Sequence, residues 1–107
     1  MNKIRILTTL LAVVLTAKMG TIQYDGHKET WYDLPVKRVV ARAQNMGIPC
    51  DYWVDERGVK MFGPWVIVAA HPSKVRYSMV QTSLGEGIIL DVHEKPDEDL
   101  IDIAVAW

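Results

Sequence analysis

The second half of the chain contains short apolar runs separated by turn residues, and this pattern limits the fold more than any other feature. Residues 65–70 (WVIVAA) form a continuous apolar run, which predicts a strand buried on both faces. Residues 87–91 (GIILD) and 100–107 (LIDIAVAW) predict two more strong strands, and residues 78–83 alternate more weakly. These runs are long enough for strands and too short for typical helices, so the region is predicted to be β-structure.

A hairpin and one helix are predicted ahead of these strands. Residues 52–54 and 59–62 flank a four-residue turn that ends in glycine, which is typical of a β-hairpin. The helix is predicted over residues 35–46, where Pro35 suits the first turn, Asp33 can cap it and Gly47 ends it. Its apolar side repeats at helical spacing through Val36, Val39, Val40, Ala43 and Met46.

One helix followed by five or six short strands predicts a mostly β, α+β domain, in the form of a small barrel or sandwich with a helical cover. Residues 18–29 are polar and contain two glycines, so they are predicted to be an extended lead-in or an edge strand. The length of 107 residues allows one compact domain.

Charge and cysteine content exclude several classes of function. The chain has 12 Lys or Arg and 13 Asp or Glu and lacks a basic cluster, which argues against nucleic acid as a partner. The single cysteine, Cys50, excludes an internal disulfide framework and a multi-cysteine zinc site.

The first seventeen residues resemble a secretory signal. Lys3 and Arg5 give a basic start, and residues 6–17 are uncharged and mostly apolar. This run is too short to span a bilayer and fits the apolar part of a signal peptide, so residues 1–17 are predicted to be a signal peptide. The alternatives are a buried first element of the domain or an uncleaved anchor. Export is favoured, which predicts a secreted protein with no stable membrane span.

Two aspartates occupy positions where a buried strand would not normally carry charge. Asp91 ends the apolar run GIIL, and Asp102 lies between isoleucines in LIDIAV. Such a carboxylate either points to solvent or lies in a pocket that favours its protonated form, as a general acid requires. Both interpretations remain open from the residues alone.

Three blocks, residues 58–70, 81–91 and 100–107, resemble the three-aspartate (3D) domain family. Its wider relatives are the double-psi β-barrels of rare lipoprotein A, expansins and the membrane-bound lytic transglycosylase A. Residues 31–35 (WYDLP) further resemble the helix start of short exported proteins from Gram-positive gut bacteria. The resemblance implies a six-stranded double-psi β-barrel over residues 30–107 with one covering N-terminal helix.

The three family aspartates correspond to His71, Asp91 and Asp102 here, so the second and third are kept. The family's Thr-Gly after the second aspartate is replaced by Val92 and His93.

The family's Pro-x-Gly-Thr/Ser turn is replaced by residues 75–78, of which only Ser78 keeps the hydroxyl. The resemblance implies that Asp102 and Asp91 are catalytic and that His71, His93 and Ser78 bind substrate.

The implied activity is cleavage of peptidoglycan glycan strands by a lytic-transglycosylase mechanism. Asp102 would protonate the leaving oxygen, and Asp91 would orient the substrate or disfavour ionisation of Asp102 by charge repulsion. The alternative is a non-catalytic barrel that binds peptidoglycan or modulates a partner, because the substitutions fall on the motif. No cofactor is expected and the protein is expected to be monomeric. A metal site formed by His71, Asp91 and His93 is a third hypothesis.

Overall fold

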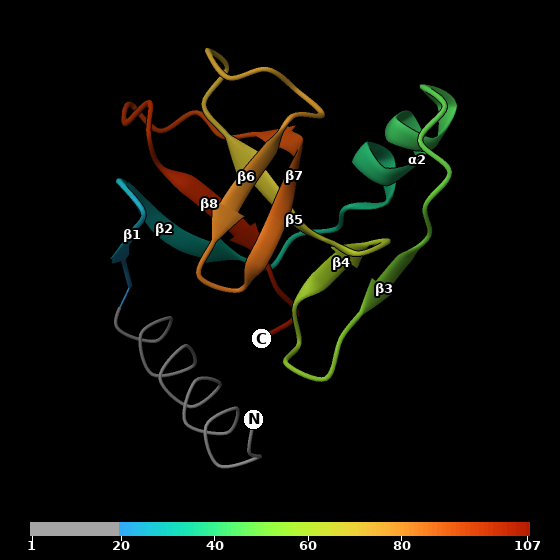
Figure 1. Cartoon of the computed structure of the whole chain (residues 1–107), viewed down its shortest axis with the longest axis horizontal. Coiled ribbons are helices and arrows are strands. Elements are labelled where there is room, and N and C mark those ends of the chain that lie inside the picture. The colour runs from blue at the N-terminus through green and yellow to red at the C-terminus, as the bar shows by residue number, and fades with distance from the viewer. Residues whose placement is uncertain (1–19) are drawn as a thin grey trace.

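The part of the chain that the computed structural model describes, residues 20–107, folds as a mostly β, α+β domain. The predicted signal peptide over residues 1–17 lies outside the described residues. One short helix accompanies an eight-stranded mixed sheet, and Figure 1 shows this helix set to one side of the strands. In chain order the elements are β1 (Ile22–Tyr24), β2 (His27–Tyr32), α2 (Lys37–Asn45), β3 (Tyr52–Val54), β4 (Lys60–Phe62), β5 (Trp65–Ala70), β6 (Met79–Thr82), β7 (Gly85–Val92) and β8 (Ile101–Ala104).

Strand β5 lies at the centre of the sheet, as its unbroken apolar sequence predicts. One edge of β5 pairs in parallel with β7. The other edge pairs antiparallel with β4 through Trp65 and Val66, and then with β8 through Val68 and Ala69. Every residue of β5 after Trp65 is buried, which confirms the expectation of a strand covered on both faces.

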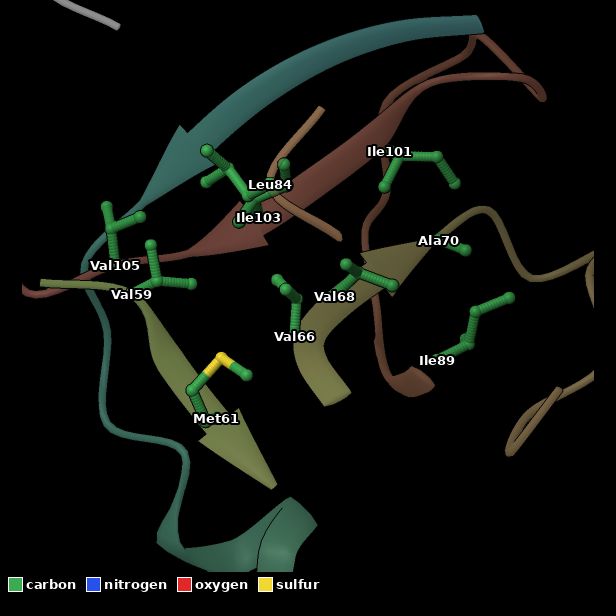
Figure 2. Packing of buried hydrophobic residues seen from close by; sticks show 10 residues of the cluster. All are labelled: Val59, Met61, Val66, Val68, Ala70, Leu84, Ile89, Ile101, Ile103 and Val105. Carbon is green, nitrogen blue, oxygen red and sulfur yellow. The ribbon is translucent and has the colours of Figure 1, made fainter. Parts of the chain in front are cut away.

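The sheet has a core on each of its two faces. We call the larger one the inner cluster, and Figure 2 shows its side chains pointing toward one another from β4, β5, β7 and β8. The inner cluster consists of Val59, Met61, Val66, Val68, Ala70, Leu84, Ile89, Ile101, Ile103 and Val105. On the other face, the helix cluster joins α2 to the sheet through Val36, Val40, Ala43, Phe62, Ile67, Ile88, Leu90 and Ala104.

The helix is shorter than predicted, because α2 begins at Lys37 instead of Pro35 and ends at Asn45. The prediction that Asp33 caps it was wrong: the N-cap residue is Val36, and no side chain caps the helix. Asp33 instead accepts a hydrogen bond from Lys60 Nζ at 2.9 Å, and Lys60 Nζ also donates to the carbonyl of Leu34. These bonds hold residues 33 and 34 against β4, so the helix begins after them.

Residues 18–29 are predicted to be an extended lead-in or an edge strand. Within this range the structure forms the edge strand β1 and the first half of β2, and residues 18 and 19 lie outside the described residues. The boundary expected at residue 30 therefore falls inside β2. Because β2 pairs in parallel with β8, both ends of the described region share the sheet. Among residues 20–107 no strand pairing closes the sheet into a barrel. No helix of this region is long and apolar enough to cross a membrane.

Shortening one side chain of the inner cluster tests the importance of this core. Ile103 is fully buried, so Ile103→Ala is expected to lower the free energy of unfolding by about 2–5 kcal/mol in urea denaturation. Val92→Ala is the matched control, because Val92 is 38% exposed on β7 and its loss should cost less than about 0.5 kcal/mol. Equal effects of the two changes would contradict the described packing.

Candidate functional site

Asp91 and Asp102 lie in one row across three paired strands. Asp102 on β8 is the register partner of Ala69 on β5, and Asp91 on β7 is the register partner of the same alanine. On the far side of β8, Thr30 of β2 is the partner of Asp102. We call Thr30, Asp102, Ala69 and Asp91 the acidic row. Asp91 and Asp102 are therefore in the same row of the sheet, each paired with Ala69.

A β-bulge in β7 brings Asp91 into this row. Val68 is paired with Ile89, but the next residue of β5, Ala69, is paired with Asp91, so Leu90 is the extra residue. In a regular strand, Asp91 would point to the same side of the sheet as Ile89, because side chains alternate along a strand. That side carries the inner cluster. The bulge turns Asp91 toward the face that carries Leu90 and the helix cluster.

Tyr32 lies close to both carboxylates. Its hydroxyl is 3.5 Å from Asp91 Oδ2, and its ring packs against the helix cluster. Burial, then the negative charges of Asp91 and Asp102, and then the hydrogen bond to Asp91 raise the pKa of Tyr32 well above its ordinary value. The phenol therefore keeps its proton and remains a hydrogen-bond donor beside the acidic row.

Asp102 is buried and held by two neighbours. Only 7% of it is exposed, and its Oδ1 accepts a 2.8 Å hydrogen bond from the Thr30 hydroxyl. Lys95 Nζ lies 3.6 Å from Asp102 Oδ2 and 3.4 Å from Thr30 Oγ1. The two carboxylate oxygens thus have different neighbours, Thr30 at Oδ1 and the half-exposed Lys95 side chain at Oδ2. Lys95 belongs to the acidic loop of residues 94–99.

The rings of His71 and His93 are neighbours, with centroids 6.1 Å apart. His93 is buried, and main-chain groups occupy both of its ring nitrogens: Nε2 bonds the carbonyl of Leu100 and Nδ1 accepts from the Lys95 amide. His71 is half-exposed, and its Nδ1 is bonded to the amide and hydroxyl of Ser73. These hydrogen bonds give His93 a role in holding the loop after β7.

The hypothesis of a metal site formed by His71, Asp91 and His93 is not supported by this geometry. Both nitrogens of His93 are already engaged, so its lone pair is not free for a metal ion. Residues 20–107 contain no group of three or more His, Cys, Asp or Glu side chains arranged to hold a metal.

Ser78 lies apart from the acidic row. It lines a groove of about 380 Å³ together with Ile89 and Ile101, two residues of the inner cluster. Ile101 and Asp102 are adjacent on β8 and so point to opposite sides of the sheet. The Ser78 hydroxyl donates to the carbonyl of Val75 at 2.5 Å. The structure thus brings Asp91 and Asp102 together but separates Ser78 from them.

Three residues of this region were not predicted from the sequence: Thr30 in the acidic row, and Tyr32 and Lys95 beside it. Thr30 and Tyr32 alternate along β2 and so share a face, a signal present in the sequence HKETWY. The resemblance of residues 31–35 to a helix start conceals this alternation. No local pattern points to Lys95, whose position depends on the path of the loop after β7.

Removing the Tyr32 hydroxyl tests whether this group lies beside the carboxylates of Asp91 and Asp102. The unfolded chain releases this phenolic proton near pH 10, whereas the raised pKa keeps it bound in the folded chain. Stability is therefore complete below about pH 10 and falls above it, by up to about 1.4 kcal/mol per pH unit. In Tyr32→Phe this loss should disappear, which urea unfolding between about pH 9 and 11.5 would detect.

Tyr52→Phe is the matched control for this experiment, since Tyr52 is exposed on β3. If the free energy of unfolding fell equally with pH in the wild type and in Tyr32→Phe, Tyr32 would not be buried beside the two carboxylates.

The geometry of the acidic row is the main structural basis for a functional proposal. No protein-family model matches the chain, and neither a curated protein nor a solved structure is similar to it.

Proposed function

We propose that this chain is an exported cell-wall protein that cleaves peptidoglycan glycan strands by a lytic-transglycosylase mechanism. The observation that carries the proposal is the bulge in β7, which aligns Asp91 with Asp102 on either side of Ala69. Acid–base cleavage of a glycosidic bond needs a carboxyl group that can donate and accept a proton, and the acidic row contains two carboxyl groups.

In this mechanism Asp102 is the general acid and base. Its proton passes to the glycosidic oxygen as the bond from that oxygen to the anomeric carbon breaks. The same carboxylate then takes the proton of the sugar's C6 hydroxyl, whose oxygen bonds to the anomeric carbon and forms the anhydro ring. Asp91 orients the sugar, and the protonated Tyr32 hydroxyl holds Asp91 in place. No cofactor takes part.

The backbone at Tyr77 supports the resemblance to the three-aspartate family. Tyr77 has a φ of 72°, a left-handed conformation that favours glycine, and it occupies the position of the glycine in the family's turn. Its amide donates to the carbonyl of Ile89 on β7. The turn thus keeps a glycine-like backbone although its residue has changed.

The same proposal includes a six-stranded double-psi β-barrel with one covering helix as the finer description of this fold. The inner cluster, gathered from β4, β5, β7 and β8, corresponds to the interior that a small barrel would fill with side chains. We further propose a secreted or wall-associated monomer, with residues 1–17 as its export signal.

The second candidate is a non-catalytic peptidoglycan-binding or partner-modulating domain. The contacts of Asp102 favour it, because the Thr30 hydroxyl and the Lys95 ammonium lie against its two carboxylate oxygens. Lys95 would also have to move before a glycosidic oxygen could reach Asp102. The substitutions at His71, Val92 and His93 fit the same candidate.

Mass spectrometry of material released from purified Gram-positive peptidoglycan tests the proposal. The mature protein is expected to release fragments with anhydro-sugar ends, and Asp102→Asn should lower this release at least about 100-fold, since general acid catalysis is worth that much. Asp51→Asn is the matched control, because Asp51 is exposed and lies outside the acidic row.

Reducing ends in place of anhydro ends would change the mechanism to hydrolysis. Sedimentation of the folded protein with the wall, without any release, would reject the enzyme and support the binding domain.

A further inference from the structure

A second polar cluster lies on the inner face of the sheet, away from the acidic row. Glu29 on β2 is completely buried, and its carboxylate accepts three hydrogen bonds. The donors are the Ser83 amide at 3.0 Å, the Ser83 hydroxyl at 2.5 Å and His27 Nε2 at 2.9 Å. Three donors on one buried carboxylate fix the orientation of the His27 ring.

This orientation leaves the other ring nitrogen of His27 available. His27 is itself 8% exposed, and within residues 20–107 its Nδ1 has no hydrogen-bond partner. When Nε2 carries the proton that it donates to Glu29, Nδ1 is an acceptor. His27 lines the groove that also contains Ser78, so its imidazole forms part of the groove wall. The hydrogen bond of the ring to Glu29 orients it there.

The groove combines an apolar floor with a negatively charged rim. Val80, Ile89 and Ile101 supply apolar surface from the inner cluster and its border. Asp25 in the turn between β1 and β2 and Asp99 ahead of β8 line the same groove. Among the described lining residues Lys74 is the only Lys or Arg, and it is paired with Asp99 at 3.3 Å, so Asp25 adds a further negative charge to the rim; Glu29 lies behind His27, outside the lining.

We propose that this groove binds a small ligand that carries a primary ammonium group on an aliphatic body. The ammonium donates a hydrogen bond to His27 Nδ1 and is attracted by Asp25 and Glu29, while the aliphatic body covers Ile89 and Ile101. An apolar pocket with a few convergent polar groups is the usual form of a small-ligand site. The turn between β1 and β2 and the loop between β5 and β6 both contribute residues to the groove.

The proposal is independent of glycan cleavage, because the two sites lie on opposite sides of the sheet. Ile101 faces the groove and its neighbour Asp102 belongs to the acidic row. Loss of wall cleavage in Asp102→Asn would leave ammonium binding unchanged, so failure of one proposal can be distinguished from failure of the other.

The test uses three probes with the same five-carbon body: pentylamine, pentanoate and 1-pentanol. Each is titrated into the ¹⁵N-labelled protein at pH 7.5 while NMR follows the His27 ring nitrogens and the amides of Gly26, Ile89 and Ile101. Pentylamine is expected to bind most tightly and to shift His27 Nδ1. Equal or tighter binding of pentanoate or 1-pentanol, or no shift at His27, would overturn the proposal.

Two variants assign the binding energy to named groups. His27→Gln should weaken pentylamine binding at least about tenfold, since hydrogen bonds to charged groups contribute that much. If this variant does not fold, Asp25→Asn still tests the site. Asp25 has a φ of 47°, which asparagine also adopts, so the turn is preserved.

Asp25→Asn should raise the dissociation constant of pentylamine about two- to fivefold and leave that of 1-pentanol unchanged. Asp51→Asn makes the same change on an exposed residue outside the groove and should have no effect. An Asp25→Asn protein that binds pentylamine as the wild type does would contradict the role of the charged rim.

Discussion

The rest of the structure depends on the burial of β5. This strand pairs with β7 along one edge and with β4 and β8 along the other. Its six residues pair with β4, β7 and β8, so they connect segments that are far apart in the chain. Such non-local pairing requires loop closure before it brings any stabilisation, and the apolar side chains of β5 on both faces supply that stabilisation. Because Ala69 is the partner of both Asp91 and Asp102, the same strand also assembles the acidic row.

The two faces of the sheet carry different chemistry, and each face has a core that holds it in place. On the face with α2, Tyr32 lies beside the acidic row. Its phenolic proton is retained because of burial and two negative charges. On the inner face, Glu29 is saturated by three donors and orders His27 beside the groove. Strand alternation keeps the two sets apart although β2 contributes to both. One short strand can therefore serve two sites.

Much of the fold was predictable because it follows from local patterns. The apolar runs around residues 65–70, 87–91 and 100–107 became β5, β7 and β8, and the hairpin of β3 and β4 formed where its turn predicted it. The start of α2 and the pairing of β2 were not predictable, because both depend on contacts with distant residues. Lys60 draws Asp33 away from the helix, and β8 recruits residues 29–32 as a parallel strand.

The sequence by itself determined that this chain is a mostly β domain with one covering helix and two aspartates in apolar strands, because strand and helix periodicities are local properties. Only the tertiary structure decided that Asp91 faces Asp102, since a one-residue bulge reverses the side on which it points. It also decided that Glu29 and His27, which are ordinary polar residues in the sequence, form a buried pair beside a groove. Burial and hydrogen-bond partners come from neighbours that no local pattern specifies.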